Sequence, residues 1–241
     1  MSTAGVTLRP WLLGMLLLIA GVLGGAAALG LQALTPDRSD VRGYLLANPE
    51  IIPEAMQKLQ ERESGKLVAA NRAAVTDPWP GMVAGNAQGN VTVAIYMDYA
   101  CGYCRQSLPE IDKLVASDPN IRLVYHELPI LSAESRTAAS WALAAAEQGK
   151  FLPFHTAMVA AGRPNDATIA AAAAKAGLDV ARARTTAASP QVAAQLEKNL
   201  RTAGALGMTG TPAWVIGDRV ISGAIGQDQL VDAVRAARAK G

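Results

Sequence analysis

The sequence predicts an α/β domain that carries an all-helical insertion and that follows an N-terminal membrane helix and a helical segment. Three observations predict this fold class. A buried strand at 91–97 leads directly into two cysteines and a helix, an alanine-rich helical block occupies about 132–206, and a short hairpin precedes a last amphipathic helix. The chain therefore divides into residues 1–35, 36–76 and 77–241.

The N-terminal residues have the composition of a membrane anchor. No charged side chain lies between Arg9 and Asp37, and residues 11–31 are almost continuously apolar. About twenty such residues in a helix span the hydrocarbon core of a bilayer. We therefore expect residues of about 10–34 to tether the protein to the inner membrane, with the rest in the periplasm or otherwise outside the cytoplasm. The alternative is a cleaved signal peptide, with the small residues 26–28 as its cleavage site.

A polar linker at 36–40 precedes a helical segment, 41–75, that is interrupted near Asn48-Pro49 and at Pro53. Its apolar residues form a loose stripe, and such a stripe must pack against another surface. That surface is either the main domain of the same chain or a second copy, and spacing alone favours neither. We predict self-association, so that the protein forms a homo-oligomer through 41–75.

Composition argues against two other classes of protein. The formal net charge is only +2 and no Lys/Arg-rich run occurs, which argues against electrostatic binding of nucleic acid. A structural zinc site generally needs four Cys or His ligands, and Cys101, Cys104, His126 and His155 are the only candidates, at a spacing unlike a zinc finger. We therefore expect no nucleic-acid partner, no metal and no cofactor.

The two cysteines, Cys101 and Cys104, are separated by two residues. A disulfide between them would close a very small loop and would restrict the unfolded chain little, so stability explains it poorly. Redox chemistry explains it better, because Cys104 can resolve a mixed disulfide formed on Cys101. Cys101 also lies where a buried strand meets a helix N-terminus, which stabilises a thiolate. We expect Cys101 to be exposed and Cys104 to be less accessible.

A second motif, Thr211-Pro212, opens the hairpin, where a cis bond before the proline is compatible with the turn. With the dithiol after a strand, it resembles the thioredoxin superfamily, specifically its DsbA-like branch, over about 80–240. The stretches ELPIL at 127–131 and FLPFH at 151–155 are similar to segments of that branch. The stretch YLLANPE at 44–50 resembles the N-terminal region of ScsC-type copper-stress disulfide proteins, which can oligomerise through it.

The resemblance implies a thioredoxin-like fold and a role for each motif residue. Cys101 is the nucleophile and Cys104 the resolving thiol. Pro212 is the cis-proline that faces the two thiols. The backbone of Thr211 pairs with a substrate strand, which is a form of β-strand addition.

The residues around the dithiol imply the direction of the exchange. Strong oxidases of this group carry Pro-His between the cysteines and Val before the cis-proline, whereas Gly102, Tyr103 and Thr211 resemble the disulfide isomerases. We therefore expect a disulfide isomerase or reductase that acts on exported proteins with cysteines and uses a membrane thiol reductase. The alternatives are a dithiol oxidase recharged by a quinone-linked membrane partner and, in a different class, a copper-binding or chaperone module.

Overall fold

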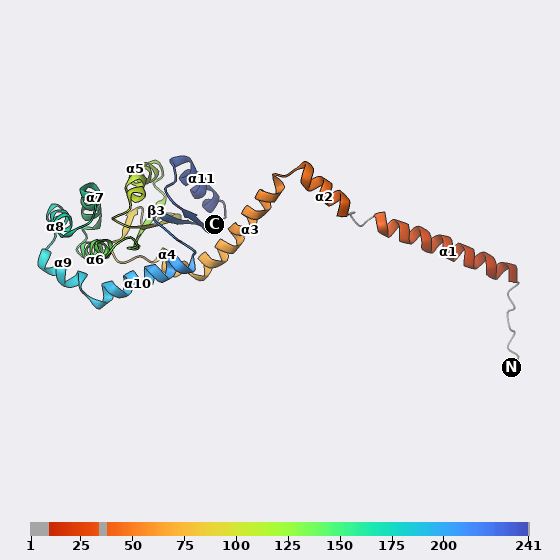
Figure 1. Ribbon diagram of the computed structural model, residues 1–241, viewed down its shortest axis with the longest axis horizontal. Helices are drawn as coiled ribbons and strands as arrows, with labels where there is room; N and C mark the ends of the chain where they lie inside the picture. The colour runs from red at the N-terminus through yellow and green to blue at the C-terminus, as the bar shows by residue number, and fades with distance from the viewer. Residues whose placement is uncertain (1–9, 34–37, 241) are drawn as a thin grey trace, which may run out of the picture. The chain divides into compact units, whose positions relative to one another are not determined.

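The computed structural model describes residues 10–33 and 38–240. Its contacts separate two units, residues 1–57 and residues 58–241. The first unit contains α1 (Pro10–Ala33), α2 (Arg38–Ala47) and the beginning of α3 (Ile51–Ala70), as Figure 1 shows. The expected break at Asn48-Pro49 separates α2 from α3. Pro53 does not interrupt the helix, because it lies in the first turn of α3, where a missing N–H is tolerated.

The expected membrane helix at about 10–34 is not supported by the structure. Among residues 10–33 and 38–240, no helix combines the length and the hydropathy that crossing a bilayer requires. Residues 1–9 and residue 34, which belong to the expected anchor region 1–35, lie outside the described residues.

The second unit is built around a five-stranded sheet with the order β1-β3-β2-β4-β5. Strands β2 (Val91–Met97) and β3 (Ile121–Glu127) are parallel and are connected by α5 (Gly102–Ser117). Strands β1 (Val83–Gly85), β4 (Ala213–Ile216) and β5 (Arg219–Ser222) each run antiparallel to their neighbours. The carboxyl ends of β2 and β3 and the amino end of β4 therefore meet at one edge of the sheet.

Five helices lie between β3 and β4, in the region where the sequence predicts an all-helical insertion. They are α6 (Ala133–Glu147), α7 (Phe151–Ala161), α8 (Asp166–Lys175), α9 (Val180–Ala187) and α10 (Pro190–Ala205). Four of them begin at a polar side chain that accepts a hydrogen bond from the first turn, namely Ser132, Asn165, Asp179 and Ser189. The α/β fold class with its helical insertion is confirmed.

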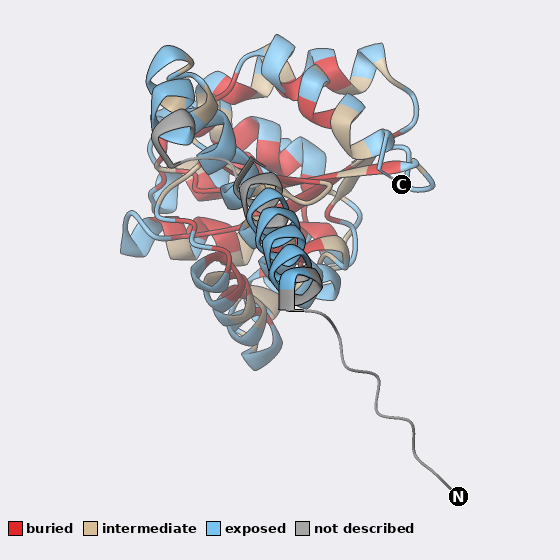
Figure 2. Ribbon diagram, turned by 90° about the vertical axis from the view of Figure 1, so that its right-hand side faces the viewer, coloured by how far each residue is buried: buried red, intermediate tan, exposed pale blue. Residues whose placement is uncertain are grey.

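Helices cover both faces of the sheet, and the residues buried beneath them form two apolar clusters (Figure 2). On one face, Val93 and Ile95 of β2 pack with α5, α11 (Gln227–Arg238) and the helical insertion. On the other face, Tyr96 packs with α10, with Val68 of α3 and with Val75 of α4 (Arg72–Thr76). Strand β2 is therefore apolar on both sides, as its sequence predicts.

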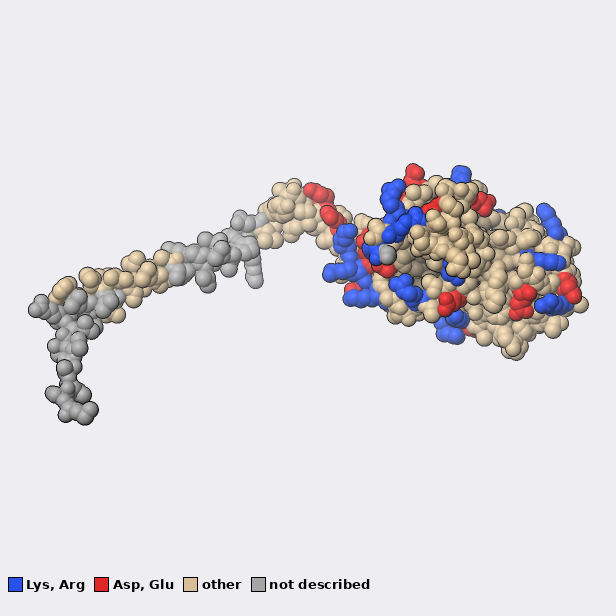
Figure 3. Space-filling view, turned by 180° about the vertical axis from the view of Figure 1, so that it is seen from behind, with Lys and Arg blue, Asp and Glu red and all other residues tan. Residues whose placement is uncertain are grey.

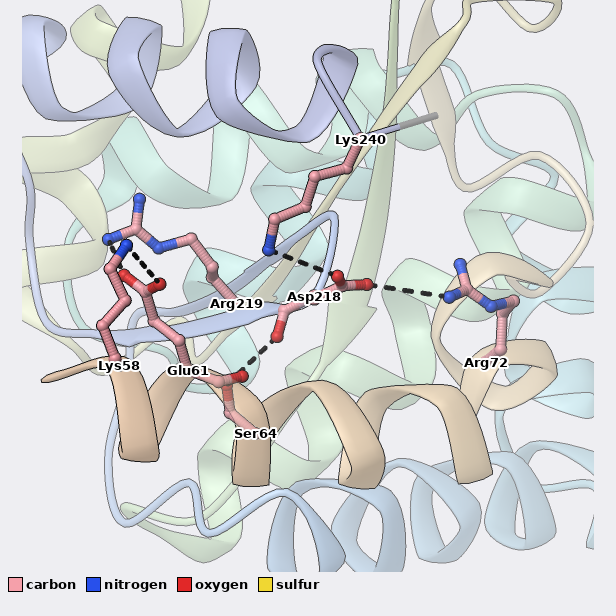
Figure 4. A network of polar contacts seen from close by, with 7 residues as sticks. All are labelled: Lys58, Glu61, Ser64, Arg72, Asp218, Arg219 and Lys240. Carbon is pink, nitrogen blue, oxygen red and sulfur yellow. Dashed lines mark hydrogen bonds and ion pairs between the residues drawn. The ribbon is translucent and has the colours of Figure 1, made fainter. Parts of the chain in front are cut away.

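A network of polar contacts joins the second half of α3 and α4 to the β4–β5 hairpin and the end of the chain (Figure 4). Its shortest links are Ser64 Oγ, which donates to Asp218 O at 3.1 Å, and a 3.4 Å ion pair between Arg219 and Glu61. The other members are Lys58, Arg72 and Lys240. Exposed ion pairs contribute little stability, so the docking of α3 and α4 depends mainly on the burial of Val68 and Val75. The end of the expected segment 41–75 thus packs on its own chain.

Charged side chains of the second unit are mixed in sign. Figure 3 shows lysines and arginines lying among aspartates and glutamates on the visible face. This distribution agrees with the small formal net charge of +2.

Candidate active site

The dithiol begins where β2 ends. The turn at 98–100 follows Met97, and Cys101 is the N-cap of α5, with an extended backbone and no side-chain hydrogen bond to the first turn. The first N–H groups of α5 therefore have no side-chain cap, and together with the helix dipole they favour negative charge at this position. Cys101 thus lies at the junction of strand and helix, as the sequence predicts.

The hairpin brings Thr211 and Pro212 to the same place. The thiol of Cys101 donates to the carbonyl oxygen of Thr211 at 3.1 Å, and the Thr211–Pro212 bond is cis, which confirms that expectation. The backbone N–H of Gly223 donates to Pro212 O at 2.8 Å and fixes the base of the hairpin. The sequence thus identified two distant motifs that the fold brings into contact.

The two thiols are free, and their solvent accessibility matches the expectation for Cys104 but not for Cys101. Cys104 is less accessible than Cys101, as predicted, with 2% of its surface exposed. The expectation that Cys101 is exposed is wrong, because the Thr211 loop packs over its sulfur and only 6% of the residue is exposed. Gly102 and Tyr103 lie between them on the surface, with 64% of Tyr103 exposed.

Burial controls the protonation of the resolving thiol. It raises the pKa of Cys104 well above the ordinary value, and a hydrogen bond from the Asp98 backbone opposes this increase only partly. Cys104 is therefore a neutral thiol at physiological pH until a base or a structural change assists it.

Asp98 is a site residue that the sequence analysis did not single out. Its carboxylate is buried and accepts backbone hydrogen bonds from Ala100 at 2.7 Å, from Ile130 at 2.9 Å and from Leu131 at 3.0 Å. It thereby joins the turn before Cys101 to the loop after β3, where Ile130 and Leu131 are partly exposed. An aspartate at the end of an otherwise apolar strand is the sequence signal that could have identified it.

A second buried carboxyl group, Glu127, lies beneath the same edge of the sheet. Burial raises the pKa of Glu127 well above its usual value, and the charge of Asp98 adds to this effect against a hydrogen bond from Tyr99. The Tyr99 hydroxyl also contacts Nδ1 of His155 at 3.0 Å. His155 is buried in the insertion, and burial lowers its pKa to about 4.

The described residues contain no group of three or more His, Cys, Asp or Glu side chains that could hold a metal ion. His126 lies on the opposite side of the sheet from the dithiol cluster, stacked on Tyr96 with ring centroids 4.5 Å apart. Its Nε2 is 2.8 Å from Val75 O. The two histidines therefore contact protein groups rather than each other or the cysteines.

Residues 92–235, more than half of the chain, match the family described as DSBA-like thioredoxin domain. The chain belongs to this family. Residues 40–64 match a second description, the copper resistance protein ScsC N-terminal domain. The expected relationship to DsbA-like and ScsC-type proteins is confirmed, and the fold is that of a DsbA-like thiol–disulfide oxidoreductase.

Two solved structures resemble this member of the DSBA-like family. A thioredoxin-like oxidoreductase from Silicibacter pomeroyi DSS-3 is 39% identical, covers 70% of this chain and 98% of its own, and has a TM-score of 0.67. A periplasmic thioredoxin-like protein from Salmonella enterica serovar Typhimurium is 28% identical, covers 70% of this chain and 95% of its own, and has a TM-score of 0.61.

A curated relative is much longer than this chain. The Na(+)/H(+) antiporter NhaA 1 of Salinispora arenicola is 31% identical over 164 residues, which are 67% of this chain and 25% of the antiporter. The chain thus spans about a quarter of the length of the curated relatives it matches.

Proposed function

We propose that this protein exchanges disulfides with exported proteins through Cys101 and Cys104, as a disulfide isomerase or reductase. The observation that carries the proposal is the 3.1 Å contact between Cys101 Sγ and the Thr211 carbonyl, with Cys104 buried one turn further along α5. The same carbonyl can accept a hydrogen bond from an extended substrate, which would place the substrate sulfur beside Cys101.

The reaction needs no cofactor. The Cys101 thiolate attacks one sulfur of a substrate disulfide, a Cys101–substrate bond forms, and the other substrate sulfur leaves as a thiolate. If a different substrate thiolate attacks the substrate sulfur of the mixed disulfide, a new substrate disulfide forms, Cys101 leaves as a thiolate, and the substrate is isomerised. Attack by the original thiolate only restores the starting disulfide. If Cys104 attacks instead, the substrate leaves reduced, and a membrane dithiol reductase must reduce the new Cys101–Cys104 disulfide.

The burial of Cys104 supports isomerisation over reduction. Only a thiolate can resolve the mixed disulfide, and burial holds the pKa of Cys104 well above physiological pH. Slow resolution lengthens the lifetime of the mixed disulfide, during which a substrate thiol can attack. The resemblance of Gly102, Tyr103 and Thr211 to isomerase residues points the same way.

Refolding of scrambled ribonuclease tests the proposal. The protein is expected to accelerate recovery of ribonuclease activity in a redox buffer, and Cys101→Ala is expected to abolish the gain. No acceleration, combined with rapid oxidation of a reduced peptide, would instead identify the dithiol oxidase. A redox titration distinguishes the two independently, because a strong oxidase has a potential of about −120 mV.

We propose that the exchange takes place outside the cytoplasm. The apolar N-terminal residues 11–31 and the periplasmic location printed for the Salmonella relative support export. Cell fractionation is the test: recovery with periplasmic markers supports export, retention in washed membranes supports the tether that the sequence predicts, and recovery with cytoplasmic markers contradicts both.

We also propose self-association through the helical segment 41–75. Val41, Tyr44, Leu46, Ile52 and Met56 are each at least half exposed. Apolar side chains exposed together on helices are typical of an interface. Sedimentation should give a multimer that becomes a monomer when Leu46 and Met56 are both replaced by Lys. The matched control is Val180→Lys, which changes an exposed apolar residue of α9. Equal masses for all three proteins would contradict self-association.

A further inference from the structure

Arg105 is the first charged residue after the dithiol, and its guanidinium group is held in place by two carbonyl groups. Nη1 lies 3.3 Å from Tyr99 O and 3.2 Å from Gly162 O, and it donates to both. Tyr99 precedes the dithiol, and Gly162 ends α7. The cation is therefore fixed where the segment leading to Cys101 meets the helical insertion.

The rest of the guanidinium group faces the dithiol turn. A Cβ atom built on Gly102 would lie 3.9 Å from Nη2 of Arg105, so this nitrogen is beside the exposed residue between the cysteines. Within the described part of the chain, no hydrogen bond or ion pair is found for Nη2 or Nε of Arg105. Guanidinium presents five N–H donors in a planar fork, which suits it to carboxylates.

The acidic groups near the turn do not neutralise this cation. Three backbone N–H groups solvate the buried Asp98 carboxylate. Glu127 is buried, and burial raises its pKa, which favours its neutral form. Tyr103, the largest exposed side chain of the turn, has no carboxyl group to pair with Arg105. The surface beside Cys101 therefore presents a fixed positive charge with unused donors.

We propose that Arg105 is a specificity-determining residue, which makes the dithiol react preferentially with disulfides that carry carboxylates close to the reacting sulfur. Such groups are aspartate and glutamate side chains next to a substrate cysteine, or a nearby C-terminal carboxylate. The inference rests on the proposed disulfide exchange. Its rival is a purely structural role, in which Arg105 only joins Tyr99 to Gly162.

The test uses the reduced full-length protein and three small disulfides of different charge. Oxidised glutathione is anionic, cystamine is cationic and bis(2-hydroxyethyl) disulfide is neutral. In each reaction the Cys101 thiolate forms a mixed disulfide with one half of the reagent and the other half leaves as a thiolate. Rates are measured at low ionic strength by acid quenching and mass spectrometry, and the quantity compared is the glutathione-to-cystamine rate ratio.

Arg105→Gln is expected to lower this ratio by about tenfold. The substitution removes the positive charge that attracts anionic glutathione disulfide and that repels the cystamine dication. Arg105→Lys should keep most of the preference, although it cannot reproduce the bridge between two carbonyls. Arg201→Gln, which removes an exposed charge on α10, is the matched control and should leave the ratio unchanged. A structural role would lower all three rates together and leave the ratio constant.

Two outcomes separate failure of this inference from failure of the proposed function. An unchanged ratio in Arg105→Gln, with all three disulfides still reacting, overturns the inference alone. A wild-type protein that reacts with none of them removes the proposed function as well. If Arg105→Gln does not fold, a salt titration of the wild type decides: the ratio should fall as salt screens the charge of Arg105, and a constant ratio overturns the inference.

Discussion

Acid should destabilise this protein through His126, and the contribution of this one side chain can be isolated. The ring is buried against Tyr96, and its Nε2 lies 2.8 Å from Val75 O of α4. Burial lowers the pKa of His126 to about 4, and the charge of Lys198 contributes in the same direction, against the hydrogen bonds with Val75 and Asn199. The folded protein therefore binds a proton at this site less readily than the unfolded chain.

The sign and the size follow from the two pKa values. In the unfolded chain the pKa of His126 is its ordinary 6.5, so the stability that neutral His126 provides is complete above about pH 6.5 and is lost as the pH falls towards 4. Each pKa unit is worth about 1.4 kcal/mol, which gives a total loss of about 3 kcal/mol below pH 4 and about 2 kcal/mol at pH 5.

The assay is urea unfolding of the wild type and of His126→Gln at pH 7.5 and pH 5. Glutamine can still donate to Val75 O but does not titrate, so the drop in stability between the two pH values should be about 2 kcal/mol smaller in the variant. His155 and Glu127 titrate in both proteins and cancel in this comparison. This cancellation is necessary because the pKa of Glu127 is raised and its effect on stability has the opposite sign.

Equal drops in the two proteins would refute the reasoning. If His126→Gln is too unstable for a complete unfolding curve, an NMR titration of the wild-type histidine rings replaces it. A His126 ring that titrates near 6.5 in the folded protein would then refute the argument, because it would show that burial does not exclude the proton.

Three further predictions test other parts of the structure. Gly81→Ala should lower the free energy of unfolding by about 3 kcal/mol, because φ is +86° and the new Cβ would lie 2.5 Å from Ala146 O, whereas Gly149→Ala, with open space around it, should cost about 1 kcal/mol. Asp218→Asn should cost about 0.5 kcal/mol, and the difference should disappear at high salt. Cys104→Ala should accumulate mixed disulfides with substrate proteins on non-reducing gels, and a metal-binding role would give none.

Local signals in the sequence were sufficient for the elements of the main domain. The short hairpin that the sequence predicts after Thr211-Pro212 is formed by β4 and β5, and Gly217 supplies its turn with a φ of +61°. Four of the five insertion helices begin at Ser, Asn or Asp caps, and all but α9 end near a glycine, which are signals that act within one turn.

Contacts between distant segments could not be predicted in the same way. The accessibility of Cys101 depends on the Thr211 loop, 110 residues further along the chain, and a thiol at a helix N-terminus says nothing about what covers it. The bridge from Arg105 to Gly162 likewise requires the position of α7. The resemblance to DsbA-like proteins supplied the pairing of the two motifs, but not these contacts.

The topology explains why the chemistry gathers at one edge of the sheet. Parallel β2 and β3 direct their carboxyl ends to the edge where antiparallel β4 begins, so the dithiol, the loop after β3 and the Thr211–Pro212 turn converge there. Convergence alone would leave three independent loops. The Asp98 carboxylate joins two of them by accepting hydrogen bonds from the backbone N–H groups of both, and the Cys101 thiol contacts the third. A substrate that displaces the Cys101–Thr211 contact therefore meets a surface whose other two parts are already held together.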